Sequence, residues 1–140
     1  VLAAFLGALI GLERELKHRP AGLRTHMLTA LAASVFTVMT FEIYHEMVEL
    51  GAGIARVDPL RVIEAVTAGV AFLAAGAIIR SGGHIKGLTT GAAMWMAGAI
   101  GVACGAGFFA VAIMAAVLVL AITFLLGIVE RRVLDGRDKS

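Results

Sequence analysis

The chain has 140 residues, of which 60% are hydrophobic and only 16% are charged, and its mean hydropathy is +0.95. A soluble globular domain is about 45–50% apolar, so this composition indicates a membrane protein and excludes an ordinary soluble fold. The net charge of +2 does not indicate nucleic-acid binding, because the basic residues cluster at the ends of apolar segments, as in the loops of membrane proteins. The single cysteine, Cys104, excludes a disulfide within the chain.

Apolar segments in chain order predict an all-α membrane protein with a bundle of five transmembrane helices. A membrane-spanning helix needs about 20 residues. The first segment supplies only Val1–Leu12 before the charges begin, so we expect the first helix to be truncated at its start. We expect the other four at residues 23–44, 59–79, 87–104 and 108–129, with the second continuing as helix beyond the membrane.

The connections are expected to be short. Asp58 followed by a proline predicts a helix start, with the carboxylate as N-cap. Residues 80–86 predict a polar turn, and Thr89 or Thr90 is expected to cap the helix after it. A flexible break is expected at residues 51–53.

The distribution of lysine and arginine predicts the orientation. Ten of the 12 fall on the side of the first turn, the loop 80–86 and the C-terminal tail, whereas only Arg56 and Arg61 fall on the other. Positive residues gather in cytoplasmic loops, so we expect the N-terminus outside and the C-terminus in the cytoplasm. Residues 1–133 are expected to form the transmembrane domain, followed by a polar, frayed tail at 134–140 and no soluble domain.

Small residues stand four apart along several predicted spans, a spacing that lets helix backbones approach closely. We expect some of these pairs to pack inside the bundle, and a dimer face is the alternative. The pairs are Gly7/Gly11, Ala65/Gly69, Gly87/Gly91, Ala97/Gly101 and Gly101/Gly105.

A dense group of charges follows the first apolar segment. A charge at the bilayer centre costs about 2.5–3.5 kcal/mol on insertion scales, so this group marks where the chain leaves the membrane. Glu13 precedes Lys17, and Glu15 precedes Arg19, by four residues, the order that favours ion pairs on a helix. The group is either a helix end with paired surface charges or a partly buried ionic cluster that meets Arg24 and could bind a partner, an anionic lipid or a small anion.

A second group of charges opens the third predicted helix. Asp58, Arg61 and Glu64 stand three apart, and we expect Glu64, the acid deepest in a predicted span, to be partly buried and paired with Arg61. Two interpretations of Glu64 stay open: a functional acid, or one partner of a structural ion pair.

Histidines and acids do not form a metal-binding pattern. His18, His26, His45 and His84 are scattered and expected to be solvated, and all ten acids lie near span ends or in loops. The sequence therefore gives no support to a magnesium channel, which needs oxygen ligands across the bilayer, although transport remains an alternative. No catalytic or cofactor-binding motif is present, so we expect neither an enzyme nor a cofactor.

The order and spacing of six motifs resemble the transmembrane domain of the MgtC/SapB family over nearly the whole chain. The motifs are GLERE at 11–15, RPAGLRT at 19–25, DPLR at 58–61, FLAAG at 72–76 with Ile78 and Ile79, GLTT at 87–90, and Trp95. The chain departs from the family pattern at Ala71 and Ala74, where glycine is usual, and at Glu64, where glutamine is frequent. Several family members also carry a cytoplasmic C-terminal domain.

The resemblance implies a multi-pass protein of the bacterial inner membrane, linked to growth in low magnesium and to survival inside host cells. It implies a regulator more than a pump, with a membrane-protein partner such as an F-type ATP synthase, and a homodimer is compatible with the glycine pairs. A dimerising module for a domain outside this sequence is a further alternative. The functional patch that we predict on the cytoplasmic face comprises Glu13, Arg14, Glu15, Arg19, Arg24, Thr25, Thr89 and Thr90.

Overall fold

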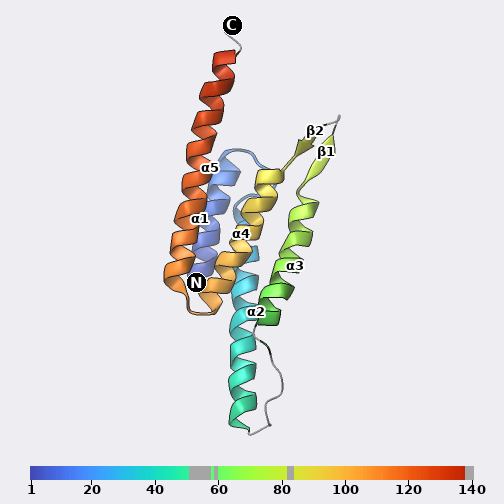
Figure 1. The fold of residues 1–140 in the computed structure, drawn as a ribbon, viewed down its shortest axis with the longest axis vertical. Helices are drawn as coiled ribbons and strands as arrows, with labels where there is room; N and C mark the ends of the chain where they lie inside the picture. Colours follow the sequence, from blue (N-terminus) through green and yellow to red (C-terminus); the bar gives the residue numbers. More distant parts are fainter. Residues whose placement is uncertain (51–57, 59, 82–83, 138–140) are drawn as a thin grey trace.

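The structure is a computed structural model that describes residues 1–50, 58, 60–81 and 84–137 (Figure 1). Five helices and one hairpin make up this part of the chain. In chain order they are α1 (Leu2–Leu16), α2 (Leu23–Glu49), α3 (Leu60–Gly76), β1 (Ile79–Ser81), β2 (His84–Lys86), α4 (Leu88–Gly105) and α5 (Phe109–Arg137). The predicted break at residues 51–53 lies outside the described residues.

Three of these helices, α2, α4 and α5, are long and apolar enough to cross a membrane. The predicted count of five spans is not supported, because α1 has 15 residues and α3 has 17. A 17-residue helix is about 26 Å long, which is shorter than the bilayer core of about 30 Å. The predicted orientation of the two termini stays a prediction.

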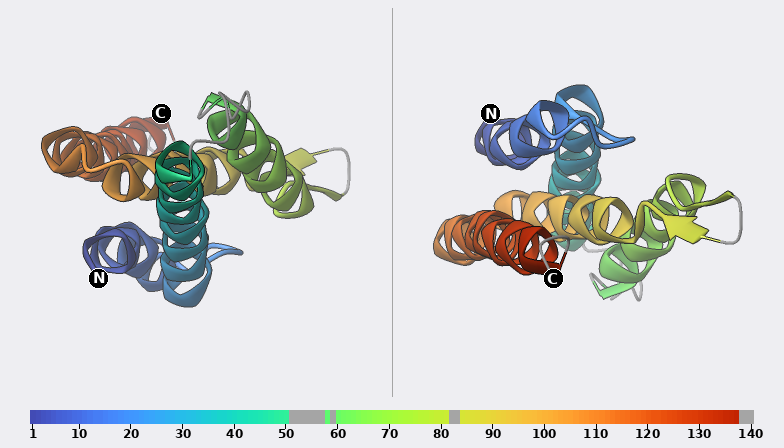
Figure 2. Two further views of the ribbon diagram at one scale, coloured as in Figure 1. Left: turned by 90° about the horizontal axis from the view of Figure 1, so that it is seen from below. Right: turned by 90° about the horizontal axis from the view of Figure 1, so that it is seen from above.

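Helix α4 lies at the centre of the bundle and packs against all four other helices (Figure 2). Helix α2 packs equally closely against α1 and α4, whereas α5 covers one side of α4 and α3 covers the other (Figure 2). Helix α3 touches α2 only lightly. The core consists mostly of alanines together with Leu6, Ile10 and Ile100, so the helix axes come close together.

Glycines make most of these close approaches possible. A Cβ on Gly7 would lie 2.6 Å from the carbonyl oxygen of His26, and one on Gly105 would lie 2.6 Å from that of Ser34. A Cβ on Gly101 would collide with the carbonyl oxygen of Ala30. The predicted packing of small residues inside the bundle is thus confirmed for these positions, whereas Gly69 of α3 has nothing within 4 Å.

Several predicted boundaries need correction. The polar turn at 80–86 is an antiparallel hairpin, with Ile79 opposite Lys86. The all-α prediction missed it because its strands are only three residues long. Helix α5 continues to Arg137, so residues 134–137 of the predicted tail are helical. The predicted extension of α2 is confirmed through Glu49.

The predicted N-cap of α3 is confirmed, whereas that of α4 is not. Asp58 caps α3 as predicted, because its Oδ1 accepts a 3.0 Å hydrogen bond from the backbone N–H of Leu60. The prediction that Thr89 or Thr90 caps α4 is wrong, since the N-cap is Gly87 and no side chain caps the helix. Gly87 has a φ of +90°, and a Cβ there would collide with the carbonyl oxygen of Ala77. The hairpin thus delivers the chain to α4 through a conformation that favours glycine.

Candidate functional site

The charges at the end of α1 lie on different sides of that helix. The buried face of α1 repeats at helical spacing through Leu6, Ile10 and Arg14, so the Arg14 side chain continues the stripe that packs into the bundle. Arg14 is only 2% exposed. The surface-only reading of this charge group is therefore wrong for Arg14, and the partly buried reading describes it.

Glu13 neutralises the buried charge of Arg14. Its Oε2 accepts a 2.5 Å hydrogen bond from Nε of Arg14, and its Oε1 pairs with the ammonium of Lys17, as the spacing predicted. The Lys17 ammonium also donates a 3.1 Å hydrogen bond to the carbonyl oxygen of Thr123 on α5. We call Glu13, Arg14 and Lys17 the ionic cluster, and it ties α1 to α5.

The electrostatics of the ionic cluster favour the charged form of Glu13, which follows the apolar part of α1. Burial alone would raise the pKa of this carboxyl, but hydrogen bonds from Lys17 and Arg14 and their positive charges outweigh burial and lower it. One carboxylate therefore faces two cations in a largely buried place. A buried pair of this kind is costly to break, because the remaining partner keeps an uncompensated charge.

Glu15 has a different role from the one that its spacing predicted. Its Oε2 accepts a 2.7 Å hydrogen bond from the backbone N–H of Leu23, and no ion pair with Arg19 is present among the described residues. The N-cap of α2 is Gly22, which has no side chain to cap the helix. Glu15 therefore caps α2 from the preceding helix and closes the first hairpin.

His26 was missed as a residue of this region and is not solvated, contrary to the prediction. It is fully buried, and its Nδ1 lies 2.9 Å from the carbonyl oxygen of Gly22, to which it donates when that nitrogen carries the proton. A signal for this burial was present in the sequence. His26 shares one face of α2 with Ala30, Ala33 and Thr37 at helical spacing. This face packs against Gly7 of α1 near His26 and against Gly101 and Gly105 of α4 further along.

The rest of the predicted patch divides by exposure. Glu15, Arg19, Arg24 and Thr89 are exposed, Thr25 is half-buried, and Thr90 is 1% exposed. We call the exposed residues Glu15, Arg19, Arg24 and Thr89, together with exposed Lys86, the exposed charged face. Of the predicted patch, Glu15, Arg19, Arg24 and Thr89 are therefore the most accessible to a partner from solution.

The second predicted group does not form an ion pair. Asp58, Arg61 and Glu64 are all exposed, and no salt bridge joins any two of them in the described chain. The prediction of a partly buried Glu64 is wrong, because the buried face of α3 is formed by Val70 and Ala74. Glu64 stands on another side of the helix, away from α4.

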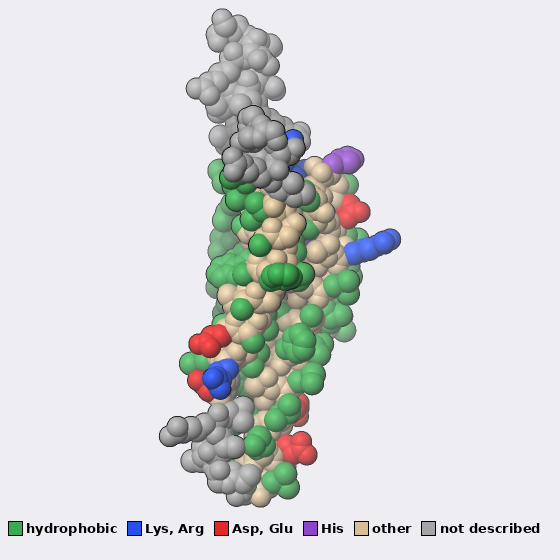
Figure 3. All heavy atoms as spheres, turned by 90° about the vertical axis from the view of Figure 1, so that its right-hand side faces the viewer, with side chains coloured by type: hydrophobic (Ala, Val, Ile, Leu, Met, Phe, Trp, Pro, Cys, Tyr) green, Lys and Arg blue, Asp and Glu red, His purple; other side chains and the backbone are tan. Residues whose placement is uncertain are grey.

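Two buried threonines of α2 form hydrogen bonds within their own helix. The hydroxyl of Thr29 donates a hydrogen bond to the carbonyl oxygen of Thr25, and that of Thr37 donates one to the carbonyl oxygen of Ala33. Both hydrogen bonds are 2.8 Å long. The face in Figure 3 has hydrophobic side chains over its middle and charged side chains towards its ends. Within the described residues, no group of three or more histidine, cysteine or acidic side chains is placed to hold a metal ion.

Comparison with known proteins agrees with the motifs. The model of the MgtC family matches residues 1–132. The chain is 40% identical over 124 residues to Protein MgtC of Brucella abortus (strain 2308), covering 89% of this chain and 48% of that protein. It is 37% identical over 131 residues to Protein MgtC of Salmonella typhimurium (strain LT2), covering 94% of this chain and 52% of that protein.

An uncharacterised protein of Haemophilus influenzae is 39% identical over 132 residues, covering 94% of this chain and 55% of that protein. The chain thus spans about half the length of the curated relatives it matches. No solved structure matches the chain. With a family model that covers all five helices up to residue 132, the chain belongs to the MgtC family of membrane proteins.

Proposed function

We propose that this protein is a non-enzymatic regulator in the bacterial inner membrane that supports growth in low magnesium. In this proposal the exposed charged face lies at the cytoplasmic surface and contacts a membrane-protein partner, for which an F-type ATP synthase is a candidate from the family resemblance alone. The ionic cluster holds the helices that carry this face. Survival inside host cells is a further expectation from the same resemblance.

The observation that carries the proposal is the division of the charges around the first hairpin. Arg14 is buried and paired with Glu13, whereas Arg19 and Arg24 are exposed and have no ion-pair partner among the described residues. Paired buried charges stabilise a fold, whereas exposed unpaired arginines suit the recognition of carboxylates or phosphates on a partner. The exposed side chains therefore support a binding role.

The interior of the bundle favours this proposal over a magnesium or other cation transporter. Magnesium requires oxygen ligands, usually including carboxylates, and retains several waters. The core that the described helices share is built from alanines and aliphatic residues, and the hydroxyls of Thr29 and Thr37 bond to their own helix. These residues offer little to a hydrated ion crossing the membrane.

The test of the regulator is growth in low magnesium of cells that lack the protein and receive variants of it. Arg19→Ala and Arg24→Ala should each reduce rescue while leaving the protein folded in the membrane, and Glu49→Ala, an exposed acid at the other end of α2, is the matched control. Rescue by the double variant Arg19→Ala/Arg24→Ala at the level of the original protein would overturn the role of this face.

The transporter is tested separately, by magnesium flux into liposomes that contain the purified protein. We expect no protein-dependent flux, with the Arg24→Ala and Glu64→Gln variants measured beside it. Flux that depends on the protein and disappears in either variant would replace the regulator by a transporter.

A dimerising module is the second alternative. It predicts that dimer formation, not the exposed charged face, controls the rescue of growth in low magnesium.

A further inference from the structure

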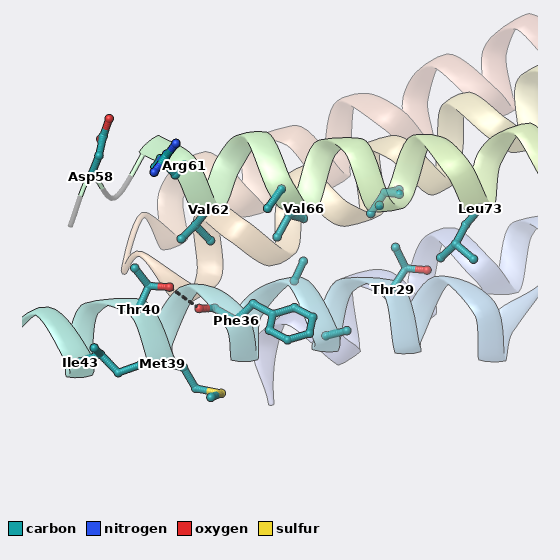
Figure 4. A pocket seen from close by; sticks show the side chains of 15 residues that line it. Thr29, Phe36, Met39, Thr40, Ile43, Asp58, Arg61, Val62, Val66 and Leu73 are labelled. Carbon is teal, nitrogen blue, oxygen red and sulfur yellow. Dashed lines mark hydrogen bonds between the residues drawn. The ribbon is translucent and has the colours of Figure 1, made fainter. Parts of the chain in front are cut away.

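A large groove separates α2 from α3 on the side of the bundle where the two helices touch only lightly. Its volume is about 730 Å³. The α2 wall includes Phe36 and Met39, and the α3 wall includes Ala65, Val66 and Leu73 (Figure 4). The α2 wall runs from Thr29 to Ile43, within a helix that is apolar enough to cross a membrane, so the groove lies at bilayer depth.

One end of the groove is charged. Asp58 and Arg61, at the start of α3, are the charged residues that line it (Figure 4). Both are exposed. Oδ1 of Asp58 caps α3, and its other oxygen accepts no hydrogen bond in the described part of the chain. Arg61 forms no ion pair there. The groove therefore presents one negative and one positive group beside a long apolar surface.

The length of the groove corresponds to one leaflet of a bilayer. Arg61 and Leu73 are 12 residues apart on α3, which is about 18 Å along a helix. Half of a bilayer core is about 15 Å thick. A lipid whose headgroup meets Arg61 would therefore reach Leu73 with its acyl chain.

The α3 wall of the groove is open enough to receive such a chain. Two of its exposed residues, Ala65 and Gly69, are small, and a Cβ added at Gly69 would meet nothing within 4 Å. By contrast, the small residues Gly98 and Gly101 of α4 are closely covered by neighbouring helices. The Ala65/Gly69 pair is thus a small-residue pair that the bundle leaves uncovered.

The charged end distinguishes a lipid from another helix. A protein helix lying along the whole groove would remove Asp58 and Arg61 from water, at a desolvation cost that their separate charges do not offset. A lipid headgroup stays at the membrane surface and matches both charges. Its phosphate can accept hydrogen bonds from the guanidinium of Arg61, and a primary ammonium can donate to the carboxylate of Asp58.

We propose that the groove between α2 and α3 is a specific binding site for a phospholipid with a primary-amine headgroup, such as phosphatidylethanolamine. The phosphate binds Arg61, the ammonium binds Asp58, and one acyl chain lies along the groove towards Leu73. This site is separate from the exposed charged face and does not depend on the function proposed above.

The experiment is native mass spectrometry of the purified full chain in detergent, titrated with three phospholipids of identical acyl chains. The headgroups are phosphatidylethanolamine, phosphatidylcholine and phosphatidylglycerol. The protein should retain phosphatidylethanolamine best, because the choline ammonium has no N–H to donate and the glycerol headgroup has no cation. Equal retention of all three lipids would overturn the proposal.

Variants assign the two headgroup contacts. Arg61→Gln should weaken binding of all three lipids by about tenfold, since each loses its charged phosphate contact. Asp58→Asn should lower phosphatidylethanolamine binding to the level of phosphatidylcholine and leave α3 capped, because asparagine caps helices as well as aspartate. Glu64→Gln, which removes an exposed charge outside the groove, should bind as the original protein does.

Filling the groove tests the acyl-chain contact. Gly69→Leu should block binding, and Gly76→Leu is the matched control, since Gly76 is equally uncrowded on the same helix but does not line the groove. Thermal unfolding of each variant in detergent establishes that it is folded. Unchanged lipid binding by a folded Gly69→Leu variant would overturn the proposal. The proposal would also be overturned if Gly69→Leu abolished a protein dimer and not lipid binding, because a second copy of the chain would then be the occupant of the groove.

Discussion

The carboxylate of Glu15 on α1 accepts a 2.7 Å hydrogen bond from the backbone N–H of Leu23, the first residue of α2. This contact supplies the cap that Gly22 lacks, and a Cβ at Gly22 would collide with the same carboxylate. A carboxylate is also favourable at the positive end of the α2 dipole. The first hairpin is therefore closed by a residue whose sequence spacing indicated a surface ion pair.

Loss of this cap should destabilise the hairpin. We expect Glu15→Ala to lower the free energy of unfolding by about 1 kcal/mol, as for other lost N-caps. Glu15→Gln should cost less, because the amide oxygen can still accept the hydrogen bond from Leu23. Denaturant unfolding in detergent measures both, with Glu49→Ala as control. A loss in Glu15→Gln equal to that in Glu15→Ala would show that the charge, not the cap, matters.

The ionic cluster should be strongly coupled. Arg14→Met leaves Glu13 without one of its two cations, and the expected loss of stability is about 3 kcal/mol, typical of breaking a buried pair. The double variant Glu13→Gln/Arg14→Met removes both charges and should recover part of that loss. A double-mutant cycle measures the coupling, and additive effects of the two substitutions would contradict the buried pairing.

Acid should weaken the same cluster. The folded protein holds the pKa of Glu13 below its ordinary value of 4.5, so the unfolded chain takes up the proton first as the pH falls. The stability that Glu13 contributes is fully present above that ordinary value and is lost as the pH falls through the lowered one. The free energy of unfolding should be measured from about pH 6 to about pH 3. Over this range it should fall less steeply with pH for Glu13→Gln than for the original protein.

Lys17 should control the docking of α5. Lys17→Met removes the hydrogen bond to the carbonyl oxygen of Thr123 and the pairing with Glu13, for an expected loss of about 1 kcal/mol. Amide hydrogen exchange should rise in α5 around Thr123 more than in α2. Lys86→Met, which changes an exposed lysine, is the control. Unchanged exchange in α5 would contradict a role of Lys17 in joining the helices.

Two glycines in helix interiors should respond in opposite directions to alanine. A Cβ on Gly11 would lie 2.7 Å from Cα of Leu23, so Gly11→Ala should destabilise the bundle by about 1–3 kcal/mol through overpacking. Gly69 is uncrowded, and Gly69→Ala should raise stability by about 0.5–1 kcal/mol because alanine favours the helix. Thermal unfolding compares the two, and equal losses would contradict the open face of α3.

The sequence by itself determined the membrane class, the family and the approximate extents of the five helices. These features depend on local properties: apolar runs, the Asp58 cap, and glycines that end or join helices. The Glu13–Lys17 ion pair was also predictable, because both partners lie on one helix and their spacing sets their distance. The small-residue pairs indicated close packing, although not which pairs would be used.

Tertiary structure decided which charges are buried and which surfaces stay open. Arg14, Glu15 and His26 have environments set by the crossing of α1 with α2, and no spacing within one helix defines that crossing. Glu64 is exposed because α3 turns another face towards α4. The groove beside Gly69 exists because α2 and α3 touch only lightly, a relationship between two helices that neither helix encodes alone.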